Sequence, residues 1–389
     1  MGGRTVHPTH TTPYGITRTG GTMSASARLV TTLAGPLESA TAGFPGERCL
    51  PGRTLILQSD DTQLAAYDLA AALAGEASVT RFPLPWPRRY GTCTVSPGLD
   101  VAVFAGVHAV RAVDRRGATL WEVRHGCWEG SCRETHASFD EYADSRGHLY
   151  ADSGSVVFSA DGKLVWAHVR GPLAAGGGDP DVIEEWLVLD ATDGTVLGRA
   201  DTQTVAAGSG HVSHPDPGQM GLSVGEGQDG APLLWGRWDG ERLSVERIDD
   251  DRCLLAVSPS GEHFLTVTHY QELLSLHRVE DGSVVSELDA EEVIPDHPAL
   301  DPNNDEPEVH WDYYGGFLDE HTVIAGTTEA DEEYGTGRHW LVDVRDMRLL
   351  GEVTYPFPTS GVPNTLGDGS WYTIAEDTKE LQVWRLADA

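Results

Sequence analysis

A hairpin with aspartate and glycine in its turn recurs along the chain, and this repeat constrains the fold more than any other feature. Short runs rich in Val, Leu, Ile, Trp and Thr, separated by Gly, Pro and Asp, predict strands and turns. Glycine supplies the positive φ that tight hairpin turns demand, and the aspartate side chain can cap the turn. The clear copies are EEWLVLDATDGTVLGRAD (184–201), LLSLHRVEDGSVVSELDA (273–290), HAVRAVDRRGATLWEV (108–123) and, without the glycine, HWLVDVRDMRLLGEV (339–353). Because no long amphipathic helix pattern occurs, we expect an all-β chain.

A second hairpin precedes most copies of the first. The clear examples are VSPGLDVAVFAG (95–106), VFSADGKLVWAHV (157–169), AVSPSGEHFLTVTH (256–269) and GGFLDEHTVIAG (315–326). Each repeat therefore holds four antiparallel strands, named a to d here, joined as a meander. The repeats start roughly 40–65 residues apart, which is near or just above the length of a β-propeller blade.

The two ends of the sequence supply the missing parts of one repeat. LQVWRLADA (381–389) is a strand c with no strand d after it, and SARLVTTLAGPL (26–37) is a strand d with no blade before it. If the early strand completes the last blade, the ring closes without a free edge. The number of c strands then predicts a seven-bladed β-propeller with four-stranded antiparallel blades. We expect one domain over 26–389 and a flexible tail over 1–25, with Met23 as an alternative start to Met1.

Some repeats match sequence patterns of known propellers. The Ala-x-Asp…Gly…Trp pattern of the quinoprotein-like repeat is matched by Ala112, Asp114, Gly117 and Trp121, and in part by Asp190 and Gly194. The Gly-His…Trp-Asp pattern of WD repeats occurs about once, at Gly210-His211 and Trp238-Asp239. The chain thus resembles the quinoprotein-like and WD-repeat-like propeller superfamily over nearly its whole length. The resemblance implies a fold and carries over no cofactor site, because fold does not imply function.

The charge balance limits the partners. With 27 basic and 60 acidic residues the formal net charge is -33, and such a field repels phosphate backbones, so we expect no nucleic acid. No apolar run approaches the roughly 18 residues of a membrane helix, and the first residues lack the apolar core of a secretory signal. Five cysteines are a sparse, odd set that fits a reducing compartment, so a cytoplasmic location is expected. The preference for arginine over lysine indicates a GC-rich bacterial genome or a salt-adapted organism.

The long connections are expected to gather on one face of the ring. In a meander the b–c and d–a connections share a face, and the long segments 124–153, 170–184, 201–220, 289–311 and 328–339 are all of these two kinds. They hold eight of the 16 histidines, and 289–312 alone holds nine carboxylates. An acidic face of this kind attracts cations, either a metal or a basic protein surface, or it simply solvates the protein. The candidate binding residues on it are His211, His214, His310, Asp312, Glu332, Glu333 and Tyr334.

Two short motifs raise the question of metals. HGCWEGSCRETH (125–136) places His125, Cys127, Cys132 and His136 within reach of one zinc ion, since zinc prefers four Cys and His ligands. A disulfide or redox pair and a loop with free thiols are the alternatives. DPNNDEPEVHWD (301–312) is similar to a calcium loop, but Glu306 replaces the required glycine and Asp312 the bidentate glutamate. Apart from zinc or calcium, no cofactor is expected.

Three functions remain open. The first is a non-catalytic binding platform that presents the acidic, histidine-bearing face to a protein partner. The second is a metal-assisted hydrolase or lyase at the mouth of the central channel, which needs histidines from several blades, such as His136, His211 and His310, to converge. The third is a redox propeller of the quinoprotein kind. The sequence has no Gly-x-Ser-x-Gly, Gly-x-x-x-x-Gly-Lys or His-Glu-x-x-His motif, and the platform is favoured.

Overall fold

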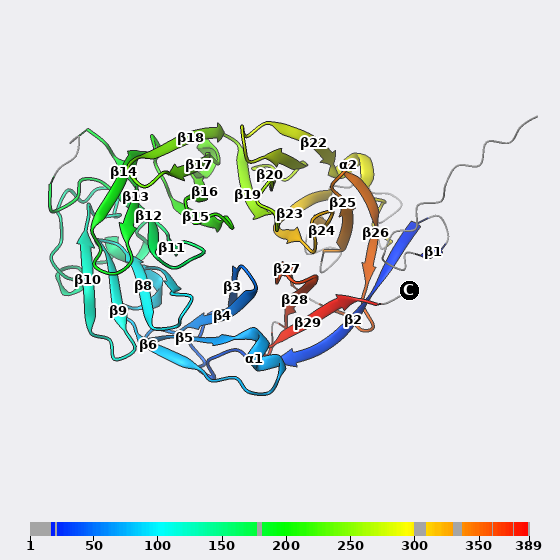
Figure 1. Cartoon of the computed structure of the whole chain (residues 1–389), viewed down its shortest axis with the longest axis horizontal. Helices are drawn as coiled ribbons and strands as arrows, with labels where there is room; N and C mark the ends of the chain where they lie inside the picture. Colours follow the sequence, from blue (N-terminus) through cyan, green and yellow to red (C-terminus); the bar gives the residue numbers. More distant parts are fainter. Residues whose placement is uncertain are drawn as a thin grey trace, which may run out of the picture.

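The computed structural model is a ring of seven four-stranded antiparallel blades around a central channel (Figure 1). It describes residues 17–19, 22–176, 181–298, 309–329, 337–359, 361–375 and 377–387. Five blades are separate sheets, and the remaining two are joined by β2 into one nine-stranded sheet that also contains β1. The predicted fold class, blade number and strand arrangement are confirmed.

The first four blades follow one another along the chain, each in the order a to d. Blade 1 is β3 (Gly46–Leu50), β4 (Arg53–Ser59), β5 (Gln63–Asp68) and β6 (Thr80–Pro83). Blade 2 is β7 (Gly91–Val95), β8 (Val101–Gly106), β9 (Ala109–Asp114) and β10 (Thr119–Arg124). Blade 3 is β11 (Val156–Phe158), β12 (Leu164–Arg170), β13 (Glu184–Asp190) and β14 (Val196–Asp201). Blade 4 is β15 (Gly208–Ser213), β16 (Gln219–Gly225), β17 (Leu233–Trp238) and β18 (Leu243–Asp249).

The last three blades complete the ring. Blade 5 is β19 (Arg252–Val257), β20 (His263–Thr268), β21 (Leu273–Arg278) and β22 (Val284–Asp289). Blade 6 is β23 (Val309–Phe317), β24 (Thr322–Glu329), β25 (His339–Asp343) and β26 (Arg348–Thr354). Blade 7 is β27 (Asn364–Thr365), β28 (Ser370–Ile374), β29 (Leu381–Leu386) and, as its strand d, β2 (Thr22–Leu33).

Helices are few and short among the residues that the structure describes. They are α1 (Leu69–Leu73), α2 (Ala290–Val293) and the 3-10 turns η1 (Arg88–Tyr90), η2 (Phe139–Glu141), η3 (Gly147–Tyr150) and η4 (Gly227–Asp229). In the part of the chain that the structure describes, none of them has the length and apolar character needed to cross a bilayer.

The N-terminal strand closes the ring, as the two chain ends predict. Its residues from Ala27 to Leu33 pair antiparallel with β29 of blade 7. The preceding residues, Ser24 to Ser26, pair in parallel with β26 of blade 6, and the short β1 (Thr17–Thr19) folds back on β2. One strand therefore belongs to two neighbouring blades, and Figure 1 shows it running along the outside of both.

Tryptophans fill the space between the blades. The c-strand tryptophans are fully buried, as expected for inter-blade packing: they are Trp186, Trp235, Trp340 and Trp384. In blades 6 and 7 the indole N–H donates to a hydroxyl on the neighbouring strand b, Thr327 at 3.3 Å and Thr373 at 3.0 Å. A buried indole N–H needs such a partner, and blades 6 and 7 each supply it from within the same blade.

The two faces of the ring differ in their connections. We call the face with the b–c and d–a connections the loop face, and the face with the a–b and c–d turns the turn face. The connections 125–155, 171–183, 290–308 and 330–338 join b to c or d to a, as expected. The c–d connection of blade 1, 69–79, is an exception, because it is also long and carries α1 on the turn face. The expectation for 201–220 is wrong, because GSGHVS forms the inner strand β15 and leaves only 202–207 as a d–a connection. The Gly and Ser residues of this segment predict a loop. In the structure the segment is a strand, because its backbone pairs with β16.

Candidate functional site

Exposed aromatic side chains gather on the loop face. Among the described residues, the exposed Phe and Tyr side chains are Phe44, Tyr150, Tyr270, Tyr313, Tyr314 and Phe357. Phe44, Tyr270 and Phe357 lie in d–a or b–c connections, and Tyr150 ends η3 within the connection 125–155. The pair Tyr313–Tyr314 lies in the first strand of blade 6. The exposed large apolar side chains of the turn face and of the outer strands are aliphatic.

A break in the pairing of β23 aims Tyr313 and Tyr314 at the channel. Trp311 pairs with Thr327 and Gly315 with Ala325, so three residues of β23 lie opposite one residue of β24. Such a bulge bends the strand and redirects its side chains. The Tyr313 hydroxyl donates a hydrogen bond to the main-chain oxygen of His269 in the neighbouring blade, which holds the ring in place.

These tyrosines line a pocket at the loop-face end of the channel. The pocket has a volume of about 590 Å³ and takes Phe44 from before blade 1, Tyr313 and Tyr314 from blade 6 and Tyr372 from blade 7. At its base the Tyr372 hydroxyl donates to the carboxylate of Glu47, and burial raises the pKa of Glu47. We call this cavity the loop-face pocket.

Asp312 adds a second carboxyl group next to the tyrosines. It is half-buried at the bulge of β23, and burial raises its pKa against the opposing effect of the Tyr313 and Tyr314 backbone N–H groups. His310 lies two residues earlier on the same strand. Glu332, Glu333 and Tyr334 lie outside the described residues, as does most of the calcium-like stretch, 301–308.

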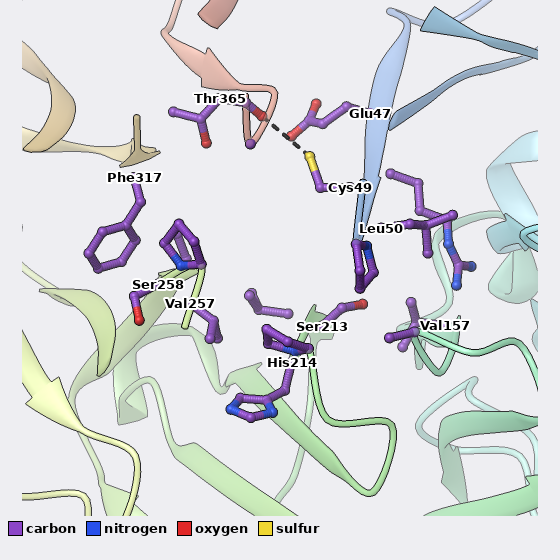
Figure 2. Close-up of a pocket in the computed structure, with 18 of the residues that line it drawn as sticks. Glu47, Cys49, Leu50, Val157, Ser213, His214, Val257, Ser258, Phe317 and Thr365 are labelled. Carbon is purple, nitrogen blue, oxygen red and sulfur yellow. Dashed lines mark hydrogen bonds between the residues drawn. The ribbon is translucent and has the colours of Figure 1, made fainter. Parts of the chain in front are cut away.

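The opposite end of the channel forms a pocket of about 560 Å³ at the ends of the a strands. Figure 2 shows Cys49, His214, Ser258, Phe317 and Thr365 around it, contributed by five blades. The Cys49 thiol donates to the Thr365 main-chain oxygen at 3.5 Å, and burial raises its pKa to about 12.

His214 belongs to this second pocket, on the turn face, and not to the loop face where the sequence analysis placed it. Its Nε2 donates to the Gly261 main-chain oxygen at 2.9 Å, and its Nδ1 accepts from the Asp216 backbone N–H at 2.9 Å. Both ring nitrogens of the neutral imidazole are therefore occupied. This arrangement fastens the a–b turn of blade 4 to that of blade 5 and leaves no lone pair for a metal.

His211 lies on the inner strand β15 and is also engaged. Its Nε2 accepts from the Trp186 indole N–H at 2.9 Å, so the neutral ring carries its proton on Nδ1, which donates to the Ser155 hydroxyl oxygen at 2.9 Å. Burial lowers the pKa of His211 to about 3. Within the described ranges, two clusters of Cys, His and carboxylate side chains could hold a metal ion. One lies around Cys127, and the other consists of Glu262, His263 and Glu320. Neither brings His136, His211 and His310 together.

The first of those groups gathers four side chains of the connection 125–155. One ligand atom each from Cys127, Cys132, His136 and His148 lies within 4.8 Å of the others. His125 is not in the group: it is fully buried, and its Nδ1 lies 2.7 Å from the Gly126 main-chain oxygen. His148, on η3, takes the place that the sequence analysis gave to His125. We call these four residues the Cys/His cluster.

Burial shifts the pKa values of two residues of the Cys/His cluster. It raises the pKa of Cys127 to about 12, with the neighbouring Cys132 adding to the rise. It lowers the pKa of His148, and the nearby His136 contributes to that shift. All five cysteines of the chain are free thiols in the structure.

No protein-family model and no curated protein matches the chain. Solved structures do: the protein is a seven-bladed propeller similar to WD40 propellers. U3-55K is 11% identical, with a TM-score of 0.52 over 92% of this chain and 98% of that one.

Two further structures agree. The RRP9 WD40 repeats are 11% identical, with a TM-score of 0.52 over 92% of this chain and 99% of theirs. A chain of the mitotic checkpoint complex is 10% identical, with a TM-score of 0.52 over 100% of both chains. At such identities the similarity establishes the fold and leaves the site to be judged on its own residues.

Proposed function

We propose that this protein is a non-catalytic, protein-binding scaffold that receives its partner on the loop face, at the mouth of the channel. The observation that carries the proposal is the gathering of the exposed aromatic side chains on that face. Aromatic residues are enriched at the centres of protein interfaces and supply much of their binding energy. One chain of the mitotic checkpoint complex, which by its name is an assembly, has the same fold, and this is consistent with such a role.

The loop-face pocket gives the partner a place to anchor. Phe44 is 60% exposed and Tyr314 52% exposed, and they line the same cavity of about 590 Å³. One side chain of a partner segment can enter a cavity of this size while the surrounding rings cover its neighbours. Exclusion of water around one buried anchor is the usual energetic pattern of an interface.

The charge of the protein selects a basic partner. The net charge is -33, and the sequence next to blade 6 is rich in carboxylates, with Asp312 beside the pocket. Positive side chains on the partner are drawn to such a field, which raises the association rate at low salt. We therefore propose a segment that combines Arg or Lys with an apolar anchor, in a cytoplasmic setting that keeps the thiols reduced.

The contacts of the channel residues favour binding over catalysis. His211 and His214 use both ring nitrogens within the fold, and Cys49 is held as a thiol. A metal-assisted hydrolase or lyase needs side chains with free lone pairs that converge on one spot, and these side chains do not supply them.

Selection from a peptide-display library on the immobilised full chain tests the proposal. We expect the selected peptides to be basic with an apolar residue, and the affinity of a selected peptide to fall about 10- to 30-fold in Phe44→Ala and Tyr314→Ala, as for interface hot spots. Leu73→Ala is the matched control, because Leu73 is an exposed apolar residue of α1 on the turn face. Peptides whose binding depends on Leu73 and not on the two aromatic residues would overturn the proposal.

A further inference from the structure

We propose that Cys127, Cys132, His136 and His148 bind one zinc ion in a closed, structural site that fixes the connection 125–155 on the loop face. This inference does not depend on the proposed binding function, since it concerns how the longest connection of the ring is held.

The spacing within the Cys/His cluster is that of a tetrahedral zinc site. Zinc lies about 2.3 Å from sulfur and 2.0–2.1 Å from nitrogen, so a sulfur–nitrogen edge of the tetrahedron measures about 3.5 Å. The Cys132 Sγ and His136 Nε2 atoms are 3.5 Å apart. With all four ligand atoms within 4.8 Å of one another, a small contraction places every one of them at bonding distance from a single ion.

Hydrogen bonds orient both histidines with Nε2 toward the cluster. The Nδ1 of His136 lies 3.2 Å from the Glu141 carboxylate, and the Nδ1 of His148 lies 2.9 Å from the Ser145 hydroxyl. A metal-bound histidine almost always has an oxygen partner of this kind on its other nitrogen, which fixes the ring and its tautomer. The Glu129 backbone N–H donates to the Cys127 sulfur at 3.4 Å, a contact that stabilises a thiolate.

One atom of the cluster calls for a ligand. His148 Nε2 is buried without a hydrogen-bond partner. A buried polar nitrogen left unpaired costs about 1–3 kcal/mol, and native structures hold few of them. The atom lies among the two sulfurs and the His136 nitrogen, so a metal ion at their centre satisfies it.

Aromatic contacts surround the cluster. The Tyr142 ring stacks on His148 with a centroid distance of 4.8 Å and lies 4.9 Å from the His136 ring. The Tyr142 hydroxyl is 2.7 Å from Nδ1 of His108, which stands between β8 and β9 of blade 2. The connection is thereby joined to the body of the blade at the point where the ligands converge.

The donor set selects the metal and the type of site. Two thiolates and two imidazoles suit zinc, and four protein ligands leave no open position for a substrate, so the site is structural. A connection of this length with only two 3-10 turns is unusual in a compact domain, and an ion that ties its start to its middle accounts for its order. A disulfide between the two cysteines would leave His148 Nε2 without a partner.

Metal content of the full-length protein, purified in a reducing buffer, tests the assignment. We expect one zinc per chain in the wild type, measured by mass spectrometry, and less than about a tenth of that in Cys127→Ser and His148→Gln, since each removes one of four ligands. His125→Gln is the matched control, because it changes the same residue type in the same connection outside the cluster. Retention of zinc in His148→Gln with loss in His125→Gln would refute the ligand set.

Two readouts keep the test decisive if a variant folds poorly. Wild-type protein stripped by a chelator should take up one Zn²⁺, and in its place one Co²⁺ with the visible bands of a tetrahedral site that includes sulfur. Glu141→Gln, which keeps all four ligands, should weaken zinc binding about 10- to 100-fold. No uptake by stripped, folded wild type, or an intact mass two hydrogens lower from a disulfide, overturns the proposal.

Discussion

At the scale of single residues, His339 shows how the propeller uses neutral histidines. The Trp371 indole N–H donates to the Tyr355 oxygen at 2.9 Å, and the Tyr355 hydroxyl lies 2.6 Å from His339 Nδ1. The Nε2 of His339 is 3.1 Å from the Gly361 main-chain oxygen. Only the neutral imidazole, which accepts at Nδ1 and donates from Nε2, completes this row of bonds.

Because this chain of hydrogen bonds needs the neutral His339 ring, the free energy of unfolding depends on pH. Burial lowers the pKa of His339 to about 4, with the Gly361 contact opposing the shift. Between pH 6.5 and 4 the unfolded chain is protonated at this residue while the folded chain is not, so the unfolded state binds more protons and stability falls as the pH falls. From pH 7 to pH 5 this residue should lower the free energy of unfolding by about 2 kcal/mol.

His339→Gln isolates that contribution, because glutamine can accept from Tyr355 and donate to Gly361 without titrating. Urea unfolding of wild type and variant at pH 7 and pH 5 provides the measurement. The wild type should lose about 2 kcal/mol more than the variant over this range, given its pKa shift. An equal loss in both would show that His339 is not the titrating group.

Three of the four residues of the Cys/His cluster are among the candidate zinc ligands that the sequence suggests, and the fourth, His148, is not. Cys127, Cys132 and His136 were found because they stand close together in the sequence. His148 was missed because it lies far from the other three residues in the sequence. Only the fold of the connection and the turn η3 place it beside them. His125 was the more obvious candidate, because it stands two residues before Cys127 in the sequence. It directly follows β10, and its side chain is buried in the blade.

At the scale of elements, the c–d turns contact the preceding blade. Gly194, in the turn of blade 3, has a φ of +74°, and a Cβ there would stand 2.7 Å from the ring of Trp121 on β10 of blade 2. The Trp121 indole N–H donates to the Ala191 main-chain oxygen at 3.0 Å. The glycine therefore serves both the turn and the contact between blades.

Gly194→Ala should lower the free energy of unfolding more than the same substitution at a glycine that has a similar positive φ but free space around the added Cβ. A left-handed φ costs an L-residue roughly 1–2 kcal/mol, and the clash with Trp121 adds about 1–3 kcal/mol. Gly52→Ala is the control, since Gly52 has a φ of +69° and nothing within 4 Å of the added carbon. Chemical unfolding of both variants measures the difference; equal losses would mean that the turn does not press on the neighbouring blade.

Elements with a strong turn signal were predicted closely, and those without it were not. The hairpins 184–201 and 273–290 match the strand pairs β13–β14 and β21–β22. β15 was not predicted because its Gly and Ser residues show no alternation of apolar and polar side chains. The strand forms because it pairs with β16. The bulge of β23 escaped for a similar reason, because register depends on the partner strand.

At the scale of the whole molecule, β2 decides whether the ring is closed. Without it, blade 7 loses its outer strand and blade 6 loses its parallel neighbour. The buried Ala25 and Ala27 side chains of β2, and Leu350 and Trp384 beneath them, would meet solvent. An open edge of this kind also exposes unpaired backbone groups.

A chain that begins after Leu33 should therefore lose most of its stability, which for a domain is about 5–15 kcal/mol. Addition of a synthetic peptide of residues 22–37 should restore the thermal transition in a concentration-dependent way, since it binds only the folded ring. A scrambled peptide is the control. An unchanged melting temperature of the shortened chain would contradict the role of β2 in closure.

The global fold was the most predictable feature of all. The recurrence of one hairpin, an orphan strand c at one end and an orphan strand d at the other were enough to count seven blades and to close them. The parallel pairing of Ser24–Ser26 with β26 was beyond the sequence, because the contact between two blades follows from the curvature of the closed ring.

The closing ladder also has a mechanical weakness. β2 and β29 run antiparallel, with Ala27 opposite Leu386 and the Ala387 N–H bonded to the Ser26 oxygen. A force that draws residues 24 and 387 apart loads the ladder at one end, so its bonds open in succession and never share the load. The closed ring should therefore open at a low force when it is pulled in this direction, because only one hydrogen bond of the ladder carries the load at a time.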